Sequence, residues 1–147
     1  MDSNLIGFVV AGVGPVIAAP VAALGTRRLF AVFFREGAAL FTGTEVHREL
    51  AHGAAMSMAI NNALIFSLAW WAAVGISAAG QSMFLIVAPF IAAVLAGVWA
   101  TTAAVRSKLH ASAGDAWLVG LLVFAGGNLP LIVIMPLLLG LVPHRGG

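Results

Sequence analysis

The fold is decided by two adjacent stretches, GAAMSMAINNALIFSLAWWAAVGISAAG (residues 53–80) and SMFLIVAPFIAAVLAGVWATTAAV (residues 82–105), which contain no Asp, Glu, Lys, Arg or His. Two further stretches of this kind cover residues 5–24 and 116–142. A helix needs about 20 mainly apolar residues to cross about 30 Å of hydrocarbon, and each stretch is long enough. A helix in a bilayer also satisfies its backbone N–H and C=O groups within its own segment. We therefore predict an all-α integral membrane protein with four transmembrane helices, at about residues 4–26, 45–79, 82–106 and 114–142.

The composition excludes a soluble domain. Of the 147 residues, 62% are hydrophobic and 8% are charged, whereas a soluble domain carries about 25% charged residues. The chain has no cysteine, which excludes disulfides, thiolate metal sites and thiol nucleophiles. Seven Lys and Arg residues are too few for a nucleic-acid-binding face. We therefore expect membrane lipid and other membrane protein subunits, or a second copy of the chain, as partners, and no nucleic acid.

Basic residues orient the helices through the positive-inside rule. Six of the seven cationic residues fall in the two connections that share one side of the membrane: Arg27, Arg28, Arg35, Arg48, Arg106 and Lys108. Only Arg145 lies on the opposite side. We expect two antiparallel hairpins packed as a four-helix bundle, with both termini on the non-cytoplasmic side, in the cytoplasmic membrane of a bacterium.

The connection between the first two helices contains basic and aromatic residues over residues 28–41. Such a segment fits either an interfacial helix, with phenylalanines at the acyl boundary and arginines at phosphates, or a continuation of the first helix past the bilayer. Thr42 and Glu45 have capping-box spacing, which predicts that the second helix begins near Thr44. Ser112 and Asp115 have the same spacing and predict the start of the fourth helix.

A weak internal duplication is also predicted. Residues 13–19 (VGPVIAA) match residues 87–93 (VAPFIAA) at five of seven positions. The offset is close to half the chain, so the first hairpin would correspond to the second, as in membrane proteins built from parallel repeats. Because Ala, Val and Ile are abundant, short matches of this kind also arise by chance, and both explanations remain open.

Polar side chains inside the apolar stretches are the first candidates for ligand binding or for lining a pore: Asn61, Asn62, Thr101, Thr102 and Asn128. An unpaired polar group is costly in hydrocarbon, so each of them needs a partner. The hairpin places the first two at the same depth as the two threonines. The same side chains can instead hold neighbouring helices together, at about 0.6–2 kcal/mol for each contact, and we favour this interpretation.

Two Gly/Pro motifs near the middle of helices are candidates for helix breaks: Gly14 with Pro15, and Gly126, Gly127 with Pro130. Proline cannot donate to the carbonyl four residues earlier, which leaves the carbonyls of Ala11 and Gly126 without their usual partners. Transporters often place substrate sites at such interruptions. Small residues also let helix backbones approach closely, which is the structural alternative.

A third candidate site lies at the expected start of the second helix. Glu45, Glu49 and His52 would share one helical face, and Glu49 and His52 have the Glu-x-x-His spacing of di-iron helical bundles. A single copy supplies too few ligands for such a metal site. A solvated face in which Arg48 and His52 balance the acidic residues explains the pattern as well, and we favour it.

These patterns favour a non-catalytic membrane subunit or scaffold that packs against other membrane proteins. The alternative is a homo-oligomeric transporter or pore for a neutral or weakly polar small solute, lined by the asparagines and threonines. A metal-dependent membrane enzyme subunit is the third and weakest interpretation. No acid–base pair lies within an apolar stretch, so enzyme activity is not expected, and the sequence does not identify a cofactor.

Overall fold

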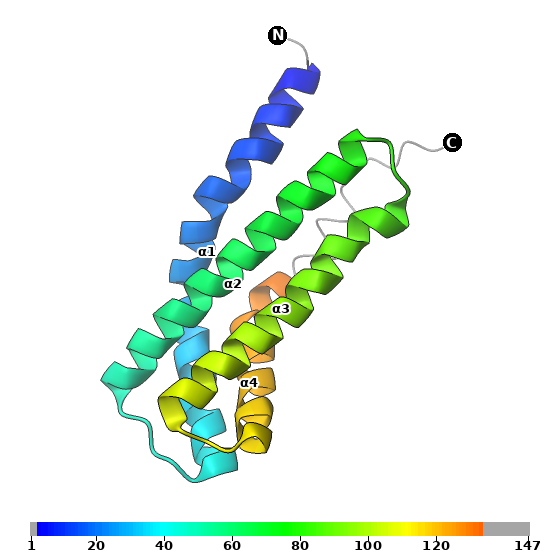
Figure 1. Ribbon diagram of the computed structural model, residues 1–147. Coiled ribbons are helices and arrows are strands. Elements are labelled where there is room, and N and C mark those ends of the chain that lie inside the picture. Colours follow the sequence, from blue (N-terminus) through cyan, green and yellow to red (C-terminus); the bar gives the residue numbers. More distant parts are fainter. Residues whose placement is uncertain (1–2, 134–147) are drawn as a thin grey trace.

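The computed structural model describes residues 3–133 of the chain. Over this range the protein is helical and contains no strand, with helices α1 (Ser3–Thr42), α2 (Arg48–Ala78), α3 (Met83–Leu109) and α4 (Ala113–Gly127). Helices that follow one another in the sequence run antiparallel (Figure 1). The main contacts join α1 to α2 and α4, and α3 to α2 and α4. The four helices therefore enclose one shared interior.

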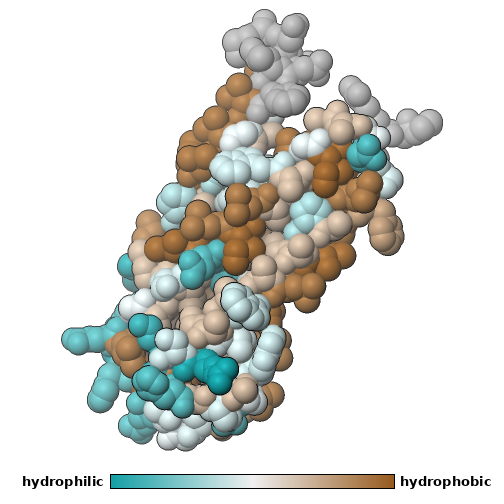
Figure 2. Space-filling view, viewed as in Figure 1, coloured by the Kyte–Doolittle hydropathy of each residue, from teal (hydrophilic) through white to brown (hydrophobic). Residues whose placement is uncertain are grey.

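Three of these helices have the length and hydropathy of membrane spans: Ala11–Thr42 within α1, Arg48–Ala78 and Met83–Leu109. The shorter α4 is also apolar, and residues 129–133 are again helical. The fourth predicted span extends to residue 142, so its second half lies outside the described residues. Large apolar side chains are exposed along α1, α2 and α3, and hydrophobic surface covers much of the length of the molecule (Figure 2). These features are those of a multi-pass membrane protein.

The first helix is longer than the predicted span 4–26, and residues 28–41 follow the second of the two alternatives, continuation of the first helix. It does not end near residue 26 but continues through residues 28–41 to Thr42. Arginine has a high helix propensity, and Phe30 and Phe34 are fully buried, so both local preference and packing favour continuation. The helix ends at Thr42, and Gly43 after it has a φ of 65° and donates from its N–H to the carbonyl of Ala39 at 3.2 Å. Segment 28–41 is thus the last third of α1.

The second helix begins at Arg48, three residues after the start of the predicted span 45–79. The expected Thr42–Glu45 capping box does not form, because Thr42 is the last residue of α1 and its Oγ1 accepts from the N–H of Thr44 at 3.3 Å. Residue 47 is the N-cap of α2 and makes no side-chain capping bond. The positive φ of Gly43 turns the chain out of α1, which leaves residues 43–47 as a non-helical link.

The start of the fourth helix predicted from Ser112 and Asp115 is confirmed. Ser112 is the N-cap of α4, and its Oγ accepts from the N–H of Asp115 at 3.2 Å. The same hydroxyl donates to Oδ2 of Asp115 at 2.8 Å. The carboxylate also lies in the first turn of α4, where the helix dipole favours a negative charge.

The core lies toward the end of the molecule where α1 meets α4. It combines large side chains from α1 and α4 with alanines of α2: Phe30, Phe34, Ala51, Ala55, Val119 and Val123. Alanine lets helix backbones approach closely, and the phenylalanine rings fill the space that remains. This core fixes the rotation of each helix about its axis and so decides which polar side chains face inward.

Candidate functional site

A chain of amide and hydroxyl groups crosses the interior and joins three helices. Asn62 of α2 donates from Nδ2 to Oγ1 of Thr101 on α3 at 3.2 Å. Asn128, which follows α4, donates from Nδ2 to Oδ1 of Asn62 at 3.4 Å. Both amides also donate to the carbonyl one turn earlier, of Met58 at 2.9 Å and of Phe124 at 2.9 Å. Both asparagines are only 2% exposed, so these bonds replace water as their partners.

The other two polar candidates do not join this network. Asn61 is exposed on the outer face of α2, about 100° around the helix from Asn62. Thr102 is buried, and its Oγ1 has no hydrogen-bond partner among residues 3–133. The five predicted polar residues therefore do not line one common passage. Three of them bond to one another, one faces outward, and one hydroxyl lies against α4.

Two glycines absent from the predicted site residues allow close packing here, Gly97 beside the network and Gly120 beside Thr102. A Cβ atom on Gly97 of α3 would lie 2.8 Å from Oδ1 of Asn62 and 2.5 Å from the ring of Phe124. A Cβ on Gly120 of α4 would lie 2.8 Å from the Cα of Thr102. The sequence does contain a signal for both: Gly97 lies four residues before Thr101, and Gly120 four residues after Ala116, which is the small-xxx-small spacing of close helix contacts.

The proline at the middle of α1 does not interrupt the helix. α1 is continuous across Pro15, and the carbonyl of Ala11 that the proline leaves free accepts from Nε1 of Trp70 at 3.3 Å. Nε1 of Trp71 donates to the next carbonyl, that of Gly12, at 3.0 Å. Gly14 is half-buried, and a Cβ there would meet nothing within 4 Å. The acceptor freed by the proline thus joins α1 to α2.

The second Gly/Pro motif produces a local irregularity at one residue. α4 ends at Gly127, Asn128 has φ −93° and ψ 8°, and the N–H of Ile132 still donates to the carbonyl of Asn128 at 2.9 Å. Pro130 lies within the helical residues that follow. This irregularity allows the Asn128 side chain to turn toward Asn62.

The paired glycines of this motif form a flat surface for two rings of α1. A Cβ on Gly127 would lie 2.6 Å from the Phe30 ring, and a Cβ on Gly126 would overlap the Phe33 ring. Both glycines are buried. Close packing of α1 against α4 therefore accounts for Gly126 and Gly127, as the structural alternative predicted.

The predicted acidic and histidine stripe is not formed. Glu45 precedes α2, so it does not share a helical face with Glu49 and His52. Among the residues described, no three His, Asp or Glu side chains lie close enough to hold a metal ion. A face shared by all three residues requires a helix that begins near Thr44, whereas α2 begins at Arg48. His52 instead lines a groove with several arginines.

The hydrogen-bonding side chains of this network are neutral amides and hydroxyls. None of the partners that they have among residues 3–133 is a titratable side chain. Such groups hold helices together or bind a weakly polar molecule, but they do not transfer protons at neutral pH. The chain matches no known protein family, no curated protein and no solved structure.

Proposed function

We propose that the protein is a non-catalytic membrane subunit that binds another membrane protein, or a second copy of itself, through the first half of α1. The observation that carries this proposal is a surface of α1 that the residues described, 3–133, leave uncovered. Between residues 6 and 25, only Pro15 and Ala23 are buried among the side chains described. Several large apolar side chains on this half of α1 are exposed: Val9, Val13, Val16, Ile17, Val21 and Leu24.

The glycines of α1 support a protein partner rather than lipid alone. A Cβ added to Gly7, Gly12, Gly14 or Gly25 would meet nothing within 4 Å. By contrast, Gly97, Gly120, Gly126 and Gly127 are each filled by a neighbouring helix. Glycine lowers helix stability by about 1 kcal/mol relative to alanine, and close approach of another backbone is the usual compensation. Gly7, Gly12, Gly14 and Gly25 thus leave room for the backbone of a partner beside the first half of α1, whereas Gly37 of the same helix already contacts α4.

The polar interior supports the same role, because its groups bond to one another. Asn62 is paired with both Thr101 and Asn128, and Trp70 and Trp71 hold the carbonyls of α1. These contacts fix the helices relative to one another. A rigid scaffold presents a constant surface to its partner.

The proposal includes the orientation of the chain in the membrane and its weak duplication. With both termini outside, the polar end of the molecule that carries Arg27 to Arg48 is cytoplasmic, as the positive-inside rule requires. The match between residues 13–19 and 87–93 would then relate α1 to α3. Labelling of single cysteines from either side of the membrane tests this orientation, because the native chain contains no cysteine.

Photocrosslinking in native membranes tests the partner surface. A photoreactive residue replaces Ile17, which is 65% exposed on α1, and the matched control replaces Leu95, which is 67% exposed on α3. We expect a crosslinked product of one discrete mass from position 17 and only lipid adducts from position 95. A mass of twice the chain identifies a second copy, and any other discrete mass identifies a different subunit. Lipid adducts alone from both positions would refute the proposal.

One observation favours the alternative of a solute transporter or pore. A hollow of about 350 Å³ lies between α2, α3 and the end of α4 with the residues that follow it, and its apolar lining includes Phe66, Phe90 and Phe124 beside Asn128. This space suits a weakly polar solute better than an ion. Uptake of a small neutral solute into proteoliposomes, reduced by a bulky Val94→Phe substitution in the hollow, would support this role. Uptake equal to that of empty liposomes would exclude it for the solute tested.

A further inference from the structure

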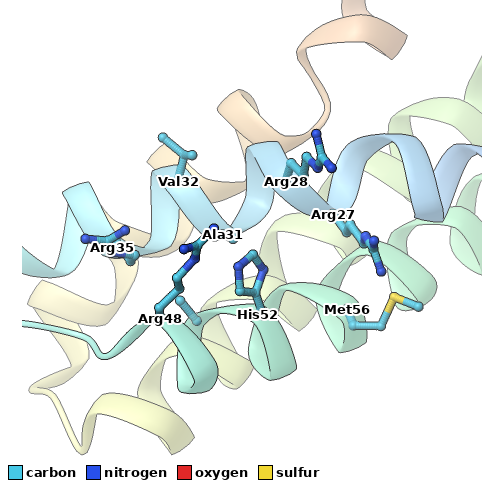
Figure 3. Close-up of a pocket in the computed structure, with 9 residues that line it drawn as sticks. Arg27, Arg28, Ala31, Val32, Arg35, Arg48, His52 and Met56 are labelled. Atoms are coloured by element: carbon cyan, nitrogen blue, oxygen red, sulfur yellow. The ribbon is translucent and has the colours of Figure 1, made fainter.

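A groove between α1 and α2 carries most of the positive charge of the molecule. Its volume is about 720 Å³, and its lining includes Arg27, Arg28 and Arg35 of α1 together with Arg48, His52 and Met56 of α2. In Figure 3, Arg48 and His52 point from α2 toward α1, and Arg27 points from α1 toward α2 near Met56. No carboxylate lines the groove within the described part of the chain. The guanidinium groups of Arg27 and Arg48 therefore face a common space between the two helices, with Arg28 and Arg35 at its border.

The groove lies where the apolar part of each helix ends. The uncharged stretch of α1 ends at Leu24 and that of α2 begins at Gly53, and the lining residues continue from these points over residues 27–35 and 48–56. Eight residues of helix extend about 12 Å, so the basic side chains extend from the hydrocarbon boundary into the headgroup layer. Val32 and Met56 add apolar surface beside the arginines. The groove is thus amphipathic and lies at the depth of lipid phosphates.

We propose that this groove is a binding site for a phosphate-bearing anion. Guanidinium groups bind phosphate oxygens through pairs of parallel hydrogen bonds, and arginine remains charged when it is partly desolvated. Basic pockets between helices on the cytoplasmic side are suited to the headgroups of acidic lipids. An acidic lipid would place its phosphate among Arg27, Arg48 and His52 and its acyl chain along Met56 and the apolar surface of α1. A soluble phosphate would use the same guanidinium groups without the apolar contact.

General attraction of arginines to an anionic membrane is the competing explanation, and it makes a different prediction. Arg106 and Lys108 lie in the last turn of α3 and are part of the same basic set, but they do not line the groove. If charge alone attracts lipid, removal of any two cations should have equal effects. If the groove forms a site, Arg27 and Arg48 should matter far more than Arg106 and Lys108.

The experiment uses the full-length protein purified in a neutral detergent. Native mass spectrometry measures retention of phosphatidylglycerol and of phosphatidylcholine by the unmodified protein, by Arg27→Gln/Arg48→Gln and by Arg106→Gln/Lys108→Gln. Far-UV circular dichroism checks that each variant is helical. We expect one phosphatidylglycerol to be bound in preference to phosphatidylcholine. The groove variant should bind it at least about tenfold more weakly, and the control variant should change affinity less than about twofold.

Inorganic phosphate then separates the two sources of the ligand. If millimolar phosphate displaces the bound lipid from the groove, the site recognises the phosphate group itself, and a soluble phosphate compound can occupy it. If phosphate does not displace the lipid, the acyl chain contributes and the ligand is a lipid. Equal losses in the groove and control variants, or no preference for phosphatidylglycerol, would overturn the proposal. The outcome is independent of the packing role of α1, because neither Arg27 nor Arg48 belongs to the surface tested by crosslinking at Ile17.

Discussion

Replacement of Gly120 by alanine tests the close contact between α3 and α4. The added Cβ would lie 2.8 Å from the Cα of Thr102, whereas carbon atoms in contact are normally about 3.5–4.0 Å apart. A backbone atom cannot move aside by changing rotamer, so the two helices must separate by about 1 Å at this point. Overpacking of this kind costs about 1–3 kcal/mol.

The intrinsic preference of helices for alanine acts in the opposite direction and must be subtracted. Gly53→Ala in α2 provides the control, because Gly53 is exposed and a Cβ there would meet nothing within 4 Å. This substitution should raise the free energy of unfolding by up to about 1 kcal/mol. Gly120→Ala should therefore be less stable than Gly53→Ala by about 1–3 kcal/mol, because the helix-propensity term largely cancels between the two variants.

Unfolding by sodium dodecyl sulfate in mixed micelles, followed by circular dichroism, measures both variants. If the two free energies of unfolding agree within about 0.5 kcal/mol, α3 and α4 do not approach as closely as described. Stabilisation by both substitutions would lead to the same conclusion and would also remove the physical basis for assigning Thr102 to the interior.

The other predictions concern single hydrogen bonds and use the same unfolding assay. Asn62→Leu should lower the free energy of unfolding by about 1–3 kcal/mol, because it removes bonds to both Thr101 and Asn128, whereas Asn61→Leu on the exposed face should change it by less than about 0.5 kcal/mol. Trp71→Phe should cost about 1 kcal/mol, because it removes the indole donor to the carbonyl of Gly12 while keeping an aromatic ring. Ser112→Ala should cost about 1 kcal/mol and speed amide hydrogen exchange in the first turn of α4.

Each of these substitutions has an outcome that contradicts its premise. Equal effects of Asn61→Leu and Asn62→Leu would mean that α2 is rotated from the orientation described. Unchanged stability of Trp71→Phe would show that the indole bond does not hold α1 against α2. Ser112→Thr retains the hydroxyl and should largely preserve stability; a loss equal to that of alanine would exclude capping as the cause.

Properties that depend on nearby residues were predictable from the sequence. Charge-free stretches predicted an all-helical membrane protein, because hydropathy over about 20 residues decides partition into lipid and the bilayer then requires internal backbone hydrogen bonds. The Ser112–Asp115 cap was also predictable, since a capping box involves one turn of chain. The boundaries of α1 and α2 were less predictable from the sequence. Burial of Phe30 and Phe34 favours a longer α1, and the positive φ of Gly43 places the start of α2 later in the chain.

Only the tertiary structure decided which polar residues meet. Asn61 and Asn62 are chemically identical neighbours, and the sequence could not show which one faces the interior, because that depends on the rotation of α2 against its neighbours. The decisive contacts join residues 39, 59 and 66 positions apart, in the pairs Asn62–Thr101, Trp70–Ala11 and Asn62–Asn128. Glycines such as Gly120 set how closely the helices approach, and that distance determines whether a side chain a few ångströms long can reach its partner. The composition therefore determined that the protein lies in lipid. Helix packing determined which side chains face the interior and which line the groove between α1 and α2.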